Sequence, residues 1–220
     1  MSKTQRELKA MRQAQRDEAA ARQKARDRRN LLIVAAGIVI AALVILVVAL
    51  ALKHGTDVAQ ANRIKFQLYT TSVGQQMPDE GTATHIDPST TWNYKNYPPT
   101  SGPHYSQPTA PVNWGTIAAE PEGVFLHNLE HGGIAVLYNC PSGSDCDSLR
   151  NQLQNYVTNL APLEPKFNES KMIMSPYSRG MQKKIAVLAW HYVLFLDSYD
   201  EKAITHFYEN HVDQGPEQIP

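Results

Sequence analysis

The sequence predicts an α+β protein with a basic helical arm at the N-terminus, one transmembrane helix and one compact extracytoplasmic domain whose first half is rich in loops. Three observations lead to this prediction. Residues 31–52 are apolar and uncharged, and residues 81–113 are dense in proline, threonine, serine and aromatic residues, which cannot sustain long helices. After residue 123, apolar runs typical of strands alternate with apolar residues at helical spacing. This order favours a single α+β domain.

Residues 1–30 form the basic arm. They contain ten lysine and arginine residues against four acidic residues, a net charge of +6, and because the whole chain is formally neutral, residues 31–220 carry −6. The arm lacks glycine and proline, which favours a helix. We expect this helix to be solvated and attracted to anionic lipid headgroups, and we expect no nucleic-acid partner.

Residues 31–52 are predicted to be a transmembrane helix, because a span needs about 20 apolar residues and this run has 22 without a charge. A secretory signal has a shorter apolar core of roughly 7–15 residues. The positive-inside rule then places the basic arm in the cytoplasm. We therefore expect a single-pass protein of the cell membrane, with the lipid bilayer as a partner, residues 53–80 as a membrane-proximal connector and residues 81–220 as the extracytoplasmic domain.

Strands and helices are expected mainly in the second half of the domain. An apolar strand is predicted at 134–139, followed by a helix with Asp147 as its N-cap. A short strand at 172–174 and a long strand at 184–196 come next. The long strand is apolar on both faces, which suggests a central place in a sheet. A last helix is predicted from about Asp200.

The two cysteines of the chain, Cys140 and Cys146, are close in sequence. Outside the membrane such a pair is most simply a disulfide. The alternative is a pair of metal-binding thiolates, which oxidation would remove as ligands.

A stretch from His127 to Gly133 combines two imidazoles and a carboxylate with a glycine pair. On a helical turn, His127 and His131 would share a face with their Cβ atoms about 5–6 Å apart. On a strand they would be separated by roughly 13 Å, too far for one ion. The glycines fit a short helix or a tight loop that ends where a positive φ is needed. The stretch is therefore typical of a metal or acid–base site.

Several motifs together resemble the family catalogued as domain of unknown function 3105. They are Pro-Pro-Thr-Ser-Gly-Pro-His-Tyr at 98–105, Trp-Gly at 114–115, His-Asn-Leu-Glu-His-Gly-Gly at 127–133, Ile-Ala-Val-Leu-Ala-Trp at 185–190 and Gly-Pro-Glu at 215–217. The resemblance covers roughly residues 60–219. It implies a bacterial or archaeal protein, often single-pass with an external domain, and no established activity.

The resemblance also implies a set of histidines. The family pattern has histidines at the positions of His85, His104, His127 and His131, and not reliably at those of His191, His206 and His211. A metal-binding domain of unestablished physiological role is the first hypothesis. Its expected ligands are His104, His127 and His131, with His85 or Met181 as the fourth and Glu130 in the second shell as the partner that fixes a ring tautomer.

Copper is the favoured ion and zinc the alternative. Imidazole suits both ions, whereas a thioether from Met172, Met174 or Met181 would bias the site towards cuprous copper. Met172 and Met174 also alternate as core residues of a strand do.

Three other interpretations stay open. The same histidines and Glu130 can form a buried polar network without an ion. His127 to His131 also satisfies H-x-x-E-H, the inverted zinc-peptidase pattern, in which Glu130 would be the catalytic base and Glu209 one candidate third ligand. Finally, the domain could serve as a scaffold for another membrane or extracytoplasmic protein. No other catalytic residue is assigned, and the sequence leaves open whether the protein is an enzyme, although it favours a role without catalysis.

Overall fold

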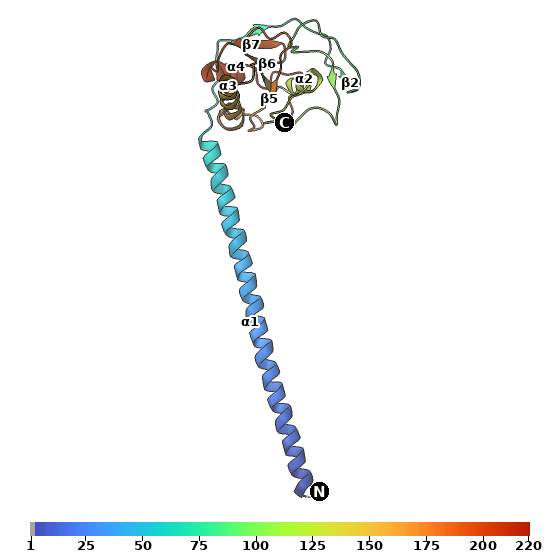
Figure 1. Cartoon of the computed structure of the whole chain (residues 1–220), viewed down its shortest axis with the longest axis vertical. Coiled ribbons are helices and arrows are strands. Elements are labelled where there is room, and N and C mark those ends of the chain that lie inside the picture. Colours follow the sequence, from blue (N-terminus) through green and yellow to red (C-terminus); the bar gives the residue numbers. More distant parts are fainter. Residues whose placement is uncertain (1–2) are drawn as a thin grey trace. The chain divides into compact units, whose positions relative to one another are not determined.

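The computed structural model describes residues 3–220, so the first two residues of the basic arm lie outside the described part. The chain divides into two compact units, the first ending at Val58 and the second spanning Ala59–Pro220. The described part of the first unit lies within helix α1 (Lys3–Ala61), which is one continuous helix (Figure 1). Between Met11 and Val58 this helix is long and apolar enough to cross a membrane by length and composition.

The second unit contains a mixed five-stranded sheet with the order β1-β7-β6-β4-β5. Its strands are β1 (Gln75–Gln76), β4 (Ile134–Tyr138), β5 (Met172–Pro176), β6 (Ile185–Ala189) and β7 (Tyr192–Leu196). Strand β4 pairs in parallel with β5 and antiparallel with β6. The chain is therefore a mixed α+β protein, as the sequence predicts.

Residues 184–196 form a hairpin, so the prediction of one long strand is wrong. Strands β6 and β7 pair antiparallel, and Ala189 opposes Tyr192 across a turn made by Trp190 and His191. His191 has a φ of +64°. A thirteen-residue strand would be about 43 Å long, whereas the neighbouring strands β4 and β5 have five residues each. Strand β6 does occupy the central position that was expected for this run.

Four helical segments complete the second unit: α2 (Glu122–Glu130), α3 (Ser144–Asn155), the π-helix η1 (Tyr156–Leu160) that continues it, and α4 (Glu201–His211). Helix α4 begins where predicted, since the Asp200 carboxylate accepts a hydrogen bond from the Ala203 amide at 3.0 Å. Helix α3 begins earlier than predicted. Its N-cap is Gly143, and Asp147 lies in its first turn, where a carboxylate still interacts favourably with the helix dipole.

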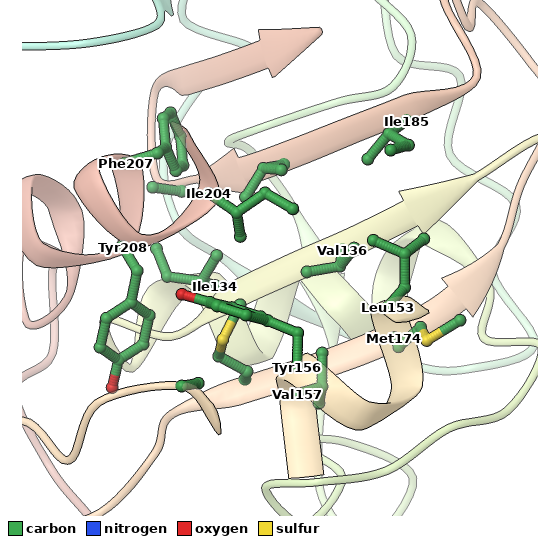
Figure 2. Close-up of a cluster of buried hydrophobic side chains, with 14 of the residues drawn as sticks. Ile134, Val136, Leu153, Tyr156, Val157, Met174, Ile185, Ile204, Phe207 and Tyr208 are labelled. Atoms are coloured by element: carbon green, nitrogen blue, oxygen red, sulfur yellow. The ribbon is translucent and has the colours of Figure 1, made fainter. Parts of the chain in front are cut away.

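The sheet has a hydrophobic cluster on each face, because alternate residues of its strands point to opposite sides. The first cluster joins Ile134, Val136, Met172 and Met174 to side chains of α3, η1 and α4 (Figure 2). The second joins Ala135, Leu137 and Ile173 to Phe125, Leu126 and Leu129 of α2. Met172 and Met174 are thus core residues on the face opposite α2, which rests against the other side of the sheet (Figure 1).

The region before α2 is mostly loop. Two short strands, β2 (His85–Ile86) and β3 (His104–Tyr105), pair in parallel beside α2. The segment predicted as a connector, 53–80, contains the end of α1. After it, Ile64 and Phe66 pack against the first cluster, and β1 pairs with β7.

Cys140 and Cys146 form a disulfide with their Cα atoms 5.4 Å apart, which confirms the predicted pairing. These are the two cysteines of the chain, so neither thiol is available as a metal ligand.

Candidate metal centre

The last turn of α2 places His127 and Glu130 on one face of the helix. Residues three apart on a helix are neighbours, and the His127 Nε2 lies 3.9 Å from the Glu130 Oε2. The helix ends at Glu130, and Gly132, two residues later, has a φ of +76°. A side chain there would also meet the Cα atom of Asp213 at 2.7 Å. The glycine therefore stops the helix where the sequence predicts a positive φ.

Two further histidines reach the same carboxylate from the loop region. In the parallel pairing of β2 with β3, His85 lies directly opposite His104. The His104 Nε2 is 2.8 Å from the Glu130 Oε2, and the His85 Nε2 is 3.2 Å from it. His85, His104, His127 and Glu130 thus each offer one ligand atom within 4.8 Å of the others, and we call these four residues the first group.

The first group is buried except on one side. His104 and Glu130 have side chains that are 0% and 4% exposed, whereas the His85 side chain is 47% exposed. The rings of His85 and His127 are stacked, with centroids 4.7 Å apart. An ion at this position would therefore be reached from solvent past His85.

The orientation of the two buried rings is fixed by backbone carbonyls. The His104 Nδ1–H donates to the Gly102 carbonyl at 2.9 Å, and the His127 Nδ1–H donates to the Tyr105 carbonyl at 2.6 Å. A carbonyl oxygen can only accept, so Nδ1 carries the hydrogen in both rings. In the neutral ring the lone pair is then on Nε2, which in both residues faces the Glu130 carboxylate. Lone pairs and a carboxylate that converge in this way require a cation, either a proton or a metal ion.

The pKa shifts favour an ionised Glu130 beside a neutral His127. Burial lowers the pKa of His127, and the hydrogen bond to the Tyr105 carbonyl opposes this shift only in part. Burial would raise the pKa of Glu130, but the hydrogen bond with His104 and the electrostatic effect of the neighbouring histidines outweigh it and lower this pKa. Near neutral pH, Glu130 is therefore ionised and His127 is neutral, which are the forms that bind a metal ion.

Comparison with known proteins identifies a family. The family model described as "Protein of unknown function (DUF3105)" matches residues 85–220, which is more than half of the chain. The chain belongs to the DUF3105 family. The match confirms the resemblance inferred from the sequence motifs, and it includes every residue of the first group. No curated protein and no solved structure matches the chain.

Within the DUF3105 domain, His131 does not belong to the first group, although its ring centroid lies 4.7 Å from that of His127. It follows α2 directly, and its Nε2 is 3.5 Å from the Glu217 Oε2. His131, Glu217 and Glu130 form a second group of ligand atoms within 4.8 Å of one another. The structure therefore places His127 and His131, which the sequence hypothesis assigns to one ion, in different groups that share Glu130.

Sequence reasoning missed two roles in these groups. It treated Glu130 as a residue that only orients a histidine ligand, whereas the Glu130 carboxylate is itself a possible ligand in both groups. It did not select Glu217, which was noted only as the end of the Gly-Pro-Glu motif. That motif was the one signal that could have drawn attention to the C-terminal segment.

The three methionines considered as ligands lie among hydrophobic side chains. Met172 and Met174 are fully buried in the first cluster, and Met181 is half-buried and packs against the second. A thioether ligand from Met181 stays a prediction. Of the other histidines, His211 and His206 bind the backbone carbonyls of Val73 and Thr71 through Nε2.

The inverted zinc-peptidase pattern gains no support from this geometry. Its two histidines belong to different groups, and the Glu130 carboxylate already lies against His104 and His85. Glu209, the candidate third ligand, lies on helix α4. Its carboxylate accepts a hydrogen bond from the Gln67 amide at 2.7 Å.

Proposed function

We propose that this protein is a membrane-anchored, extracytoplasmic metal-binding protein whose first group, His85, His104, His127 and Glu130, holds a transition-metal ion. The observation that carries the proposal is the fixed orientation of His104 and His127. Each donates Nδ1–H to a backbone carbonyl and turns Nε2 towards Glu130. Histidine ligands of metal ions usually donate their other ring N–H to a carbonyl or carboxylate, which fixes the tautomer and the ring orientation.

The donor atoms favour a divalent ion. Three imidazole nitrogens and one carboxylate oxygen suit divalent copper or zinc, whereas cuprous copper prefers sulfur ligands. Divalent copper generally binds nitrogen and oxygen sites more tightly than zinc. Copper is therefore our first choice at equal free concentrations of the two ions, and four protein ligands are enough to fill a tetrahedral site.

The anchor is helix α1. Large apolar side chains such as Leu31, Ile38 and Ile45 are more than half exposed on it, and apolar side chains that point outward on all sides suit a lipid environment. The basic arm before them favours a cytoplasmic N-terminus. The DUF3105 domain would then bind metal outside the cell membrane, with the lipid bilayer as its partner.

A metal-free network is the alternative, and one contact favours it. The 2.8 Å contact between the His104 Nε2 and Glu130 would satisfy both groups if His104 were protonated, because an imidazolium donates from both nitrogens. This interpretation makes the histidines important for stability with or without metal.

The test is metal analysis of the full-length chain, purified in detergent, stripped with chelator and titrated separately with copper and zinc. Wild-type protein should bind at least one ion tightly, and His127→Ala should abolish binding to the first group. His206→Ala is the matched control, because His206 lies on α4 and binds the Thr71 carbonyl. It should retain the wild-type amount of metal.

Melting curves separate the two interpretations. If a metal ion is held by the first group, chelator should lower the melting temperature of the wild type by more than that of His127→Ala. A folded wild type that binds neither ion and melts at the same temperature with and without chelator would refute the metal site in favour of the network.

A further inference from the structure

The second group of ligand atoms, Glu130, His131 and Glu217, remains after the first group has been assigned. Their ligand atoms lie within 4.8 Å of one another. The His131 side chain is 7% exposed and that of Glu217 is 47% exposed. This group is therefore a buried imidazole and a buried carboxylate, completed from the solvent side by a second carboxylate.

Backbone contacts hold Glu217 in this position. The Glu217 amide donates to the Glu130 carbonyl at 2.9 Å, and the Asp213 amide donates to the Gly132 carbonyl at 2.9 Å. Gly215 lies between them, so close to α2 that a Cβ atom would collide with the Glu130 carbonyl and the Gly132 amide. The Gly-Pro-Glu motif thus has a physical reason, because the glycine permits the close contact that brings the glutamate to His131.

A buried lysine fixes the same segment on both sides of Glu217. Lys171 is fully buried, and its ammonium group donates to the Asp213 carboxylate at 2.6 Å and to the Ile219 carbonyl at 2.7 Å. It also donates to the His131 carbonyl at 3.2 Å. Lys171 therefore connects the segment from Asp213 to Ile219 with the backbone of His131, and the His131 ring faces Glu217.

The two groups differ in how many ligands the chain supplies. The first group has four, whereas the second has three, the number that leaves an exchangeable position in catalytic zinc sites. His131 also lines a cavity of about 220 Å³, together with Val112, Trp114 and Glu169. This volume has room for water or a small ligand beside His131, the one member of the second group that lines it.

We propose that Glu130 bridges two divalent metal ions, the second of which is held by His131 and Glu217 and keeps one position for a small oxygen-donor ligand such as water. A carboxylate has two oxygens with several lone pairs, so one glutamate can serve both ions. The proposal rests on the proposed function, since the first ion supplies the other half of the bridge.

The test counts zinc ions on full-length protein in detergent, first stripped with chelator and then equilibrated at a fixed free zinc concentration. Wild-type protein should hold two ions per chain, and Glu217→Gln should hold one. Glu169→Gln removes the same charge from a residue that lines the same cavity but belongs to neither group. It should keep two ions.

The bridge itself is tested by Glu130→Gln, which should lower the occupancy of both ions, and a loss of only one would contradict the bridge. A wild type with a single ion that Glu217→Gln leaves in place would overturn the second site and leave the first intact. A wild type without zinc or copper would overturn both proposals. Because Glu217 is half exposed, its variant should fold, and circular dichroism spectra that match the wild type would verify this.

Discussion

At the scale of single residues, the tautomers of the histidines in the candidate centre are set by backbone carbonyls, which can only accept hydrogen bonds. The carbonyls of Gly102 and Tyr105 accept from Nδ1 of His104 and His127, and this leaves Nε2 for Glu130 or an ion. Neither carbonyl can be recognised from the sequence as a partner, because both contacts depend on how the loops fold. The histidines themselves were recognisable from the family pattern.

His211 leads to a prediction about pH that is independent of the metal. Burial lowers the pKa of this residue, although the hydrogen bond to the Val73 carbonyl opposes the shift, and His206 lowers the pKa further. The folded protein therefore binds this proton less readily than the unfolded chain, whose histidines have a pKa of about 6.5. The stabilising contribution is present above about pH 6.5 and is lost as the pH falls.

Thermal unfolding of chelator-treated protein at about pH 7.5 and about pH 5.5, on either side of the histidine pKa, measures this effect. The melting temperature should be lower at the acidic pH, and the difference should be smaller for His211→Gln, which does not titrate. Equal differences for wild type and variant would show that His211 does not contribute.

At the scale of secondary-structure elements, the sequence predicted helix ends correctly where a single residue determines them. Asp200 caps α4 through its own side chain, and Gly132 ends α2 with a positive φ. The hairpin of β6 and β7 was missed because Trp190 and His191 carry no turn signal. Its position is decided by pairing with β4 and β1 on either side, and those pairings are distant in sequence.

The disulfide gives a prediction at this scale. Cys140 and Cys146 close a short loop between β4 and α3, and closing such a loop should contribute about 2–3 kcal/mol to the free energy of unfolding. The double variant Cys140→Ser/Cys146→Ser should therefore unfold at lower denaturant concentration, while its metal content stays the same, since neither cysteine belongs to a ligand group. Two alkylatable thiols in wild-type protein taken from its native compartment would contradict the pairing.

At the scale of the whole molecule, a long apolar helix precedes one mixed α+β domain. The charge difference between the two parts is large, because the basic arm carries +6 and the remainder −6. If α1 crosses the membrane, this difference favours an N-terminus in the cytoplasm and a domain on the opposite side.

Protease protection tests this topology. Protease added outside intact cells should remove an epitope placed after the end of α1, at Ala61, and spare one within the basic arm. A control with permeabilised cells should lose both epitopes. The reverse pattern of protection would show that the domain faces the cytoplasm.

The sequence by itself determined the features that depend on neighbouring residues or on composition. These are the long apolar helix, the α+β class, the disulfide, the start of α4 and the positive φ at Gly132. It also supplied the histidines through motifs of the family. Only the tertiary structure decided how they are grouped. Proximity in the sequence suggested that His127 and His131 bind one ion. In the structure, the packing of the loops against α2 brings His85 and His104 to Glu130. The C-terminal segment brings Glu217 to His131. The physical reason is that such contacts depend on the pairing of β2 with β3 and on the close approach of Gly215 to α2, which no local pattern specifies.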